Sequence, residues 1–263
     1  MKTIYKDLSS YDSLLAYKLS VLCKNIYYNK DTFLNGLKNF GFTSCEYIEK
    51  KNIELFLGYR DNFIIIVFRG TDSVKDWLTN IKITGMKEHQ FLGKVHRGFL
   101  SGFELVKEDI DKFVSKYYKE TDHIICTGHS LGGALSALCS VEYYISTSKK
   151  VYNYTYGCPR FCDRKFAEKY NKMFFGRSFR HVNQNDVVCQ IPAPIKYRHV
   201  GQEIYFDEEG IRYFDSGLWQ KIYNFFLGSF TDFFSLGFDC VKDHSMSYYF
   251  ANLLYYINRT NEE

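Results

Sequence analysis

The sequence predicts an α/β fold in which a mainly parallel central sheet carries helices on both faces. Short strand-like runs alternate along the chain with longer segments whose apolar residues recur at helical spacing, and this alternation is typical of parallel sheets. One of the runs, Ile64–Phe68, is apolar at every position, as expected for a strand that is covered on both faces.

The first predicted element is an amphipathic helix over about residues 11–29, because Leu15, Leu19 and Leu22 recur at helical spacing. The strands predicted after it are Ile53–Tyr59, Phe63–Phe68, His123–Thr127, Val151–Tyr156 and Ser178–Val182. The helices predicted between and after these strands are Phe99–Tyr118, Gly132–Ile145, Arg164–Lys172 and Met246–Ile257.

The 263 residues of the chain allow one large domain or two small ones. No repeat or Gly/Ser/Pro-rich linker divides the sequence, so we expect a single domain over residues 1–263 with an N-terminal helical extension over about 1–50. An apolar content of 46% argues against global disorder. A dispersed net charge of +4 argues against nucleic-acid binding. The sequence also contains no long uncharged apolar run of the kind that predicts a transmembrane helix.

Eight cysteines are scattered along the chain without a CxxC pair, which argues against a structural zinc site. We expect neither a metal nor a cofactor. The N-terminal segment contains Lys2, Lys6, Asp7 and Asp12 and lacks the apolar core of a signal peptide. We therefore expect free thiols and a cytoplasmic, intracellular location.

The segment Gly128-His129-Ser130-Leu131-Gly132 follows one predicted strand and opens the next predicted helix. A G-x-S-x-G sequence in that position is typical of a nucleophile elbow, in which a strained turn presents the serine hydroxyl clear of the sheet. Glycines flank the serine because a Cβ would clash where helix and strand approach each other. Leu131 lies at the N-terminus of the predicted helix, where its backbone N–H points toward the oxyanion formed at an attacked carbonyl.

We therefore predict that Ser130 is a nucleophile, with an ordinary glycine-rich turn as the alternative. His129 fills the variable position of the motif, where packing is the expected role.

The segment Thr127–Leu135 resembles the elbow of the class 3 (fungal-type) lipases, a branch of the α/β-hydrolases. The resemblance implies the α/β-hydrolase fold and extends over about residues 60–250. The further segments that carry it are Phe68-Arg69-Gly70-Thr71, Asp76-Trp77, Val95-His96-Arg97-Gly98-Phe99, Thr155-Tyr156-Gly157-Cys158-Pro159-Arg160, Asn183-Gln184-Asn185-Asp186-Val187-Val188 and Asp243-His244-Ser245-Met246. The chain departs from the family at Phe161-Cys162-Asp163, where small polar residues are common, and in lacking the signal peptide of secreted relatives.

A serine hydroxyl needs a base within hydrogen-bond reach and a third group that orients the base. In α/β-hydrolases the acid and then the histidine follow the serine, which leaves His181, His199 and His244 as candidates for the base. We favour His244, which precedes the last predicted helix and matches the catalytic histidine of the family. His199 is a weaker candidate, and His181 is expected to be a satisfied core residue because it lies inside a predicted strand.

Asp186 is the predicted acid of the site. It follows the predicted strand Ser178–Val182, at the sheet edge where functional residues of parallel sheets gather, and it matches the aspartate of the family. Asp163 and Asp239 remain weaker alternatives, for which an exposed loop carboxylate is the ordinary interpretation.

The resemblance implies that the backbone N–H of Thr71 is the second oxyanion donor beside that of Leu131. Arg69, two residues earlier, is expected to form a structural ion pair.

The resemblance also implies a lid at Ser73–Asn80, with Val74, Trp77 and Leu78 on one apolar stripe that contacts substrate. A short packed surface helix is the alternative. The aromatic-rich segment Leu218–Phe238 is interpreted equally well as a second flap, an interfacial segment or two packed helices.

Together these residues predict a serine carboxylic ester hydrolase, a lipase that cleaves acylglycerol esters through an acyl-enzyme intermediate. A phospholipase A1 or another acyl esterase is the alternative within the same chemistry, and a catalytically silent lipid-binding relative is the alternative from another class. The expected partner is a lipid or ester substrate and no nucleic acid. Transient contact with a membrane or lipid-droplet surface, and the oligomeric state, are left open.

Overall fold

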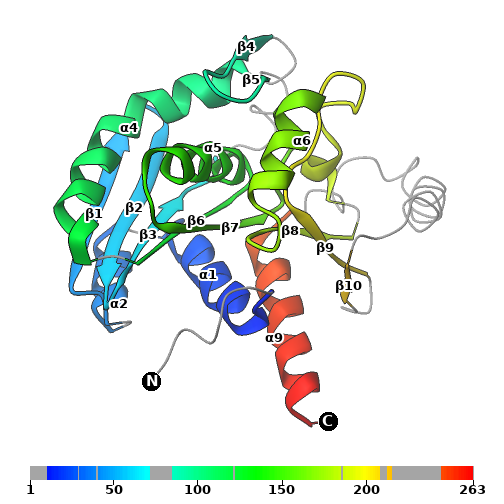
Figure 1. The fold of residues 1–263 in the computed structure, drawn as a ribbon. Helices are drawn as coiled ribbons and strands as arrows, with labels where there is room; N and C mark the ends of the chain where they lie inside the picture. The colour runs from blue at the N-terminus through cyan, green and yellow to red at the C-terminus, as the bar shows by residue number, and fades with distance from the viewer. Residues whose placement is uncertain are drawn as a thin grey trace.

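The computed structural model describes residues 11–28, 30–39, 41–71, 85–120, 122–184, 186–207, 212–214 and 244–262. Within these ranges one sheet has the strand order β1-β2-β3-β6-β7-β8-β9-β10, and β4 pairs separately with β5 (Figure 1). The strands are β1 (Ser44–Lys50), β2 (Ile53–Arg60), β3 (Phe63–Phe68), β4 (Met86–Glu88), β5 (Lys94–His96), β6 (His123–His129), β7 (Lys150–Tyr156), β8 (Ser178–Asn183), β9 (Gln202–Phe206) and β10 (Arg212–Phe214). The α-helices are α1 (Ser13–Asn25), α2 (Lys30–Asn39), α4 (Arg97–Tyr117), α5 (Leu131–Ser146), α6 (Arg164–Met173) and α9 (Met246–Glu262), and the 3₁₀ turns are η1 (Tyr118–Glu120) and η2 (Val187–Gln190).

The centre of the sheet is parallel, as the sequence predicts. Strands β3, β6, β7, β8 and β9 pair in parallel in that order. The antiparallel pairs lie at the two edges, where β1 and β2 precede β3 and β10 follows β9. The predicted α/β fold with a mainly parallel sheet is therefore confirmed.

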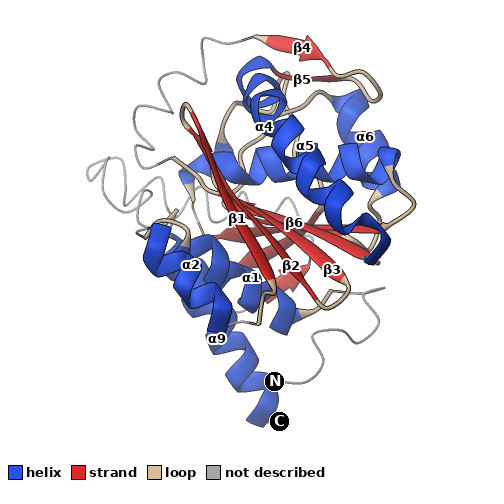
Figure 2. Ribbon diagram, turned by 90° about the vertical axis from the view of Figure 1, so that its left-hand side faces the viewer, coloured by secondary structure: helices blue, strands red, loops and turns tan. Residues whose placement is uncertain are grey.

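Helices cover both faces of this sheet. Helices α4, α5 and α6 pack on one face, and α1, α2 and α9 pack on the other (Figure 2). Strand β3 divides its side chains between the two cores, with Ile64 and Ile66 in one and Ile65 and Val67 in the other. This alternation accounts for the continuous apolar run in the sequence.

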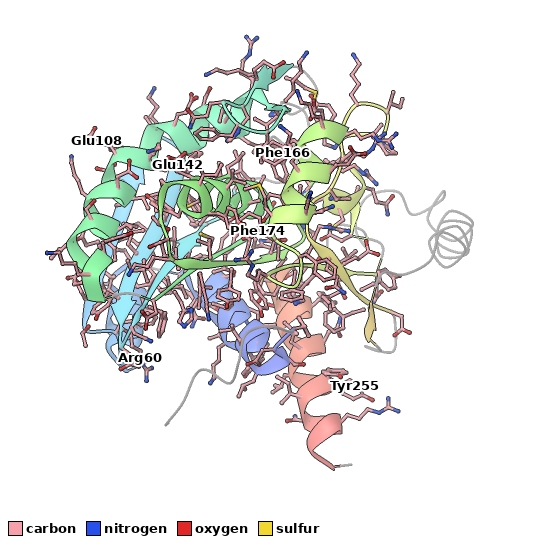
Figure 3. The ribbon with its side chains drawn as sticks, viewed as in Figure 1. Arg60, Glu108, Glu142, Phe166, Phe174 and Tyr255 are labelled. Carbon is pink, nitrogen blue, oxygen red and sulfur yellow. The ribbon has the colours of Figure 1, made fainter. Side chains whose placement is uncertain are left out.

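The core beneath α6 is strongly aromatic. Phe166 and Phe174 are buried in it, while Glu108 on α4 and Tyr255 on α9 lie at the surface (Figure 3). Aromatic side chains bury a large apolar area per residue, so they supply much of the packing on this side of the sheet.

The N-terminal extension is shorter than the expected helical region of about 1–50. Residues 44–50 form the edge strand β1, which joins β2 through a two-residue turn at Lys51 and Asn52. The sequence hid this strand because its exposed residues Glu46 and Glu49 lie on opposite faces of a strand at the open edge of the sheet, so no one-sided apolar alternation marks it. Residues 196–200, which contain the candidate base His199, lie outside the named strands and include an isolated bridge at Arg198.

The carboxyl ends of four parallel strands meet at one edge of the sheet. Gly70 follows β3, Ser130 follows β6, Gly157 follows β7 and Asp186 follows β8. In open parallel sheets this is the edge where ligands bind, and it brings the sequence-predicted site residues together.

Candidate active site

Ser130 occupies a strained turn between β6 and α5. Its backbone angles, φ 58° and ψ −129°, lie in a region that non-glycine residues rarely adopt. The surrounding chain holds this conformation: the Ser130 N–H donates to the carbonyl of Tyr156 at 2.9 Å, and the Ser130 carbonyl accepts from the Gly133 N–H at 2.9 Å. The serine is buried, with its side chain at the carboxyl edge of the sheet.

The glycines of the elbow are required by close backbone contacts. A Cβ on Gly128 would collide with the carbonyl of Gly132, and a Cβ on Gly132 would collide with the carbonyl of Phe68 on β3. Backbone atoms cannot move aside as the end of a flexible side chain can, so only glycine fits at either position. The predicted reason for the two glycines is confirmed.

The predicted oxyanion donors lie in the two segments on either side of Ser130. Leu131 is the first residue of α5. Thr71, half-buried, follows Gly70, whose missing side chain leaves room for the Ser130 Cβ and the Tyr27 hydroxyl. Both donor assignments stay predictions.

Asp186 and His244 are in direct contact. His244 Nδ1 lies 3.0 Å from Oδ1 and 2.9 Å from Oδ2 of the carboxylate. The Tyr249 hydroxyl donates to Oδ2 at 2.6 Å, and the Val188 N–H donates to Oδ1 at 2.8 Å. Because an ionised carboxylate only accepts hydrogen bonds, His244 carries its proton on Nδ1 and leaves Nε2 as the bare nitrogen.

The surroundings keep Asp186 ionised. Burial by itself raises the pKa of this carboxyl group, but attraction to His244 and the hydrogen bonds from His244, Tyr249 and the backbone outweigh it, so that the pKa lies below its ordinary value. The carboxylate therefore remains a hydrogen-bond acceptor at neutral pH.

Two reactive atoms of the site have no hydrogen-bond partner among the described residues. These atoms are Ser130 Oγ and His244 Nε2, both buried. They are not hydrogen-bonded to each other, and catalytic hydrogen bonds are often formed only in the substrate complex. Gly157 lies between the serine and the histidine. It follows Tyr156, whose carbonyl accepts the Ser130 N–H, and a Cβ on Gly157 would lie 2.9 Å from His244 Nδ1.

His129 is also part of this cluster. Its ring stacks on that of His244 with centroids 4.4 Å apart, and its two nitrogens contact the His244 backbone carbonyl and the Tyr27 hydroxyl. Burial, followed by the nearby His244, lowers the pKa of His129 to about 3. Sequence reasoning expected only packing at this position.

Sequence reasoning missed Tyr27 and Tyr249 entirely. The one available signal was the position of Tyr249 near the start of the helix that follows His244. Tyr27 comes from the distant N-terminal segment and offered no signal.

The weaker histidine candidates have other partners. His181 is buried in β8, where Nε2 contacts the Tyr11 hydroxyl at 3.0 Å and Nδ1 contacts the Thr155 carbonyl at 3.0 Å. It is the satisfied core histidine that the sequence predicts. His199 Nε2 contacts the carbonyl of Cys189 at 2.8 Å.

Two polar residues near the motifs have structural contacts. Asp163 caps α6 by accepting the Phe166 N–H at 2.7 Å, and it is therefore occupied at a helix terminus. Arg69 forms an ion pair with Glu54, as expected from the sequence.

Several predicted features fall outside the described residues. These are the lid at Ser73–Asn80 with Val74, Trp77 and Leu78, the segment Leu218–Phe238, and the alternative acid Asp239. The lid therefore stays a prediction.

Within the described part of the chain, no three His, Cys, Asp or Glu side chains cluster in a way that would hold a metal ion. No helix in the same ranges has the length and apolar character needed to cross a membrane.

Comparison with known proteins places this geometry in a family context. The family model described as Lipase (class 3) matches residues 65–196. A lipase of Rhizomucor miehei is 31% identical over 160 residues, which cover 57% of this chain and 44% of that protein. Phospholipase A1-II 4 of Oryza sativa subsp. japonica is 28% identical over 188 residues, which cover 61% of this chain and 47% of that protein. The chain thus spans slightly less than half the length of these curated relatives.

The solved structures agree on the fold. The triacylglyceride lipase of Rhizomucor miehei superposes with a TM-score of 0.63 at 24% identity, covering 76% of this chain and 82% of that one. At this identity the likeness supports the α/β-hydrolase fold.

Proposed function

Because this chain belongs to the class 3 lipase family, we propose that it is a serine carboxylic ester hydrolase that cleaves acylglycerol esters. The proposal rests on two observations at the same edge of the sheet: a serine hydroxyl without a hydrogen-bond partner at a strained elbow, and a histidine whose Nδ1 contacts a carboxylate while its Nε2 has no partner among the described residues. Ser130 stands at the strained elbow, and Asp186 binds His244 Nδ1 at 2.9 Å.

In the proposed mechanism Ser130 Oγ attacks the ester carbonyl carbon while His244 Nε2 takes the hydroxyl proton. Asp186 keeps the imidazole in the Nδ1–H tautomer and stabilises the imidazolium that forms. The N–H groups of Leu131 and Thr71 bind the oxyanion of the tetrahedral intermediate.

The intermediate collapses when the ester C–O bond breaks and the leaving alcohol takes the proton from His244 Nε2. This leaves an acyl group on Ser130. A water molecule then gives a proton to His244 Nε2 as its oxygen bonds to the acyl carbon. The bond between the acyl carbon and Ser130 Oγ breaks, Oγ takes the proton back from His244, and the fatty acid leaves. Neither step needs a metal or an organic cofactor.

A phospholipase A1 activity is the second candidate, because one of the similar proteins is named phospholipase A1. Both activities use the same acyl transfer and differ only in the head group next to the ester. The same proposal includes contact with a lipid surface and a lid formed by residues 73–80, because long-chain esters gather at interfaces.

An intracellular location is also part of the proposal. It is supported by six buried cysteines of the described ranges that form no disulfide there, Cys23, Cys126, Cys139, Cys158, Cys162 and Cys189. Free thiols are typical of reducing compartments. Fluorescence of a tagged chain in its own cells tests this, and recovery of the protein from the culture medium with oxidised cysteines would contradict it.

A hydrolysis panel tests the enzymatic proposal. The purified chain is assayed on p-nitrophenyl butyrate, emulsified tri- and diacylglycerols and phosphatidylcholine vesicles, beside Ser130→Ala. We expect ester hydrolysis that disappears in Ser130→Ala while the circular dichroism spectrum is unchanged. Hydrolysis of phosphatidylcholine alone would favour the phospholipase, and absence of turnover on every ester would favour a silent lipid-binding protein.

A further inference from the structure

His129, the residue before the nucleophile, contacts the base through both its ring and its hydrogen bonds. The two imidazole rings of His129 and His244 stack at 4.4 Å with an interplanar angle of 29°. His129 Nε2 lies 2.7 Å from the backbone carbonyl oxygen of His244. His244 precedes α9 by two residues and is not part of a helix or strand, so contacts of this kind help to fix its position.

The partners of His129 define its tautomer. A carbonyl oxygen only accepts, so Nε2 must carry the ring proton and donate it. The other nitrogen, Nδ1, then accepts from the Tyr27 hydroxyl at 2.8 Å. The neutral ring is consistent with burial, which lowers the pKa of His129 to about 3.

Tyr27 comes from a part of the chain outside the 65–196 range of the family model. It follows α1, and its hydroxyl fits beside the elbow because Gly70 has no side chain. The Arg69 guanidinium lies over its ring, 5.3 Å from the centroid. Tyr27 therefore connects the N-terminal segment with the elbow.

We propose, on the basis of the proposed ester hydrolase function, that Tyr27 and His129 are positioning residues that hold the backbone of His244 at a fixed position relative to Ser130. The Tyr27 hydroxyl holds His129 in the Nε2–H tautomer, and that N–H holds the His244 carbonyl. Because His129 and Ser130 are adjacent in the chain, the elbow then fixes the nucleophile and the base together. Neither Tyr27 nor His129 exchanges a proton with the substrate.

The molecule contains a matched arrangement that does not touch the base. His181 also has a tyrosine hydroxyl, that of Tyr11, on one ring nitrogen and a backbone carbonyl, that of Thr155, on the other. Its ring also stacks on an aromatic neighbour, Tyr156, at 4.6 Å. His181→Phe therefore removes the same kinds of contact from the core without releasing the His244 carbonyl.

The kinetic test compares His129→Phe with His181→Phe on p-nitrophenyl butyrate. His129→Phe keeps an aromatic ring but removes the donor, so kcat is expected to fall about 10- to 100-fold with KM unchanged, the size of loss that follows from misplacing a catalytic group by about 1 Å. His181→Phe is expected to lower the melting temperature and to leave kcat per folded molecule at the wild-type value. His129→Gln, whose side-chain amide both donates and accepts, is expected to restore most of kcat.

A spectroscopic readout tests the geometry independently of turnover. In protein labelled with ¹⁵N-histidine, long-range correlations are expected to show a protonated Nε2 and a bare Nδ1 for His129 from pH 5 to 8. Tyr27→Phe removes the partner of Nδ1, so it is expected to lower kcat in the same direction as His129→Phe and by less.

The outcomes separate the two levels of the proposal. An active wild type with His129→Phe at the wild-type kcat, or a His129 that carries its proton on Nδ1, would overturn the positioning role alone. Equal losses of kcat in His129→Phe and His181→Phe would also overturn it, since the role would then be structural. A wild type that hydrolyses no ester would overturn the proposed function and the positioning role with it.

Discussion

The two sides of the candidate site are held in place by different interactions. On the serine side, Gly128 and Gly132 let β6, α5 and β3 approach so closely that backbone contacts set the position of Ser130. On the histidine side, the carboxylate of Asp186 collects hydrogen bonds from His244 and from other donors around it.

The difference corresponds to what each group has to do. The serine needs one fixed position, and tightly packed backbone supplies it. The histidine must hold one tautomer, carry a positive charge briefly and then give the proton back. A hydrogen bond to an ionised carboxylate fixes the tautomer and stabilises that charge. We therefore expect substitutions of the packed glycines on the serine side to act first on folding, and substitutions on the histidine side to act first on turnover.

Among substitutions that leave Ser130 in place, the largest effect on turnover is expected from Asp186→Asn. An amide at this position no longer holds the Nδ1–H tautomer, so kcat should fall by about 10⁴-fold while the fold is kept. Asp163→Asn is the matched control, because Asp163 is also a capping aspartate, accepting the Phe166 N–H at 2.7 Å, and asparagine caps helices as well as aspartate does. Equal activities of the two variants would show that the carboxylate has no catalytic role.

The largest effect on folding is expected from Gly132→Ala. Its Cβ would meet the backbone carbonyl of Phe68, and overpacking of this kind destabilises proteins by about 1–3 kcal/mol. Urea denaturation measures the loss. Gly85→Ala is the control because a Cβ there has no atom within 4 Å, and a similar free energy of unfolding for both variants would contradict the packing account.

The buried His129 predicts an acid-dependent loss of stability. Its folded-state pKa of about 3 lies below the unfolded reference of about 6.5, so the unfolded chain binds the extra proton between these values. The free energy of unfolding should therefore decrease as pH falls below about 6.5, with up to about 1.4 kcal/mol per pH unit from this group. Denaturation at several pH values should give a shallower slope for His129→Gln, and identical slopes would count against a neutral buried ring.

The smallest effect is expected from Tyr249→Phe. This change removes one hydrogen bond to the Asp186 carboxylate, of 2.6 Å, and a hydrogen bond to a charged group contributes about 1.5–3 kcal/mol. With the remaining donors still in place, we expect kcat to fall about tenfold, the equivalent of about 1.4 kcal/mol. Tyr255→Phe on the exposed side of the same helix serves as the control and should match the wild type.

Local sequence was sufficient for most of the parallel sheet and for the elbow. The run Ile64–Phe68 predicts a doubly covered strand, and the glycines around Ser130 predict a close approach of backbones. Both features depend on residues next to each other in the chain, where spacing alone carries the information.

The rest depends on contacts between distant segments. Tyr27 and Tyr249 meet the site from either end of the chain, and nothing in their local sequence distinguishes them from the other tyrosines. His129 occupies a variable motif position, and its contact with the His244 carbonyl exists only after the sheet and α9 have assembled. The edge strand β1 was missed because its charged residues conceal the alternation.

Labelling with a fluorophosphonate, followed by peptide mass spectrometry, tests the central claim most directly, because the probe reacts only with a serine that a neighbouring base activates. We predict one phosphonate group, attached to Ser130, in the wild-type chain, and labelling that is strongly slowed in His244→Ala. A chain that takes up no label, or one whose label lies on another residue, would contradict the assignment of Ser130 and His244 as nucleophile and base.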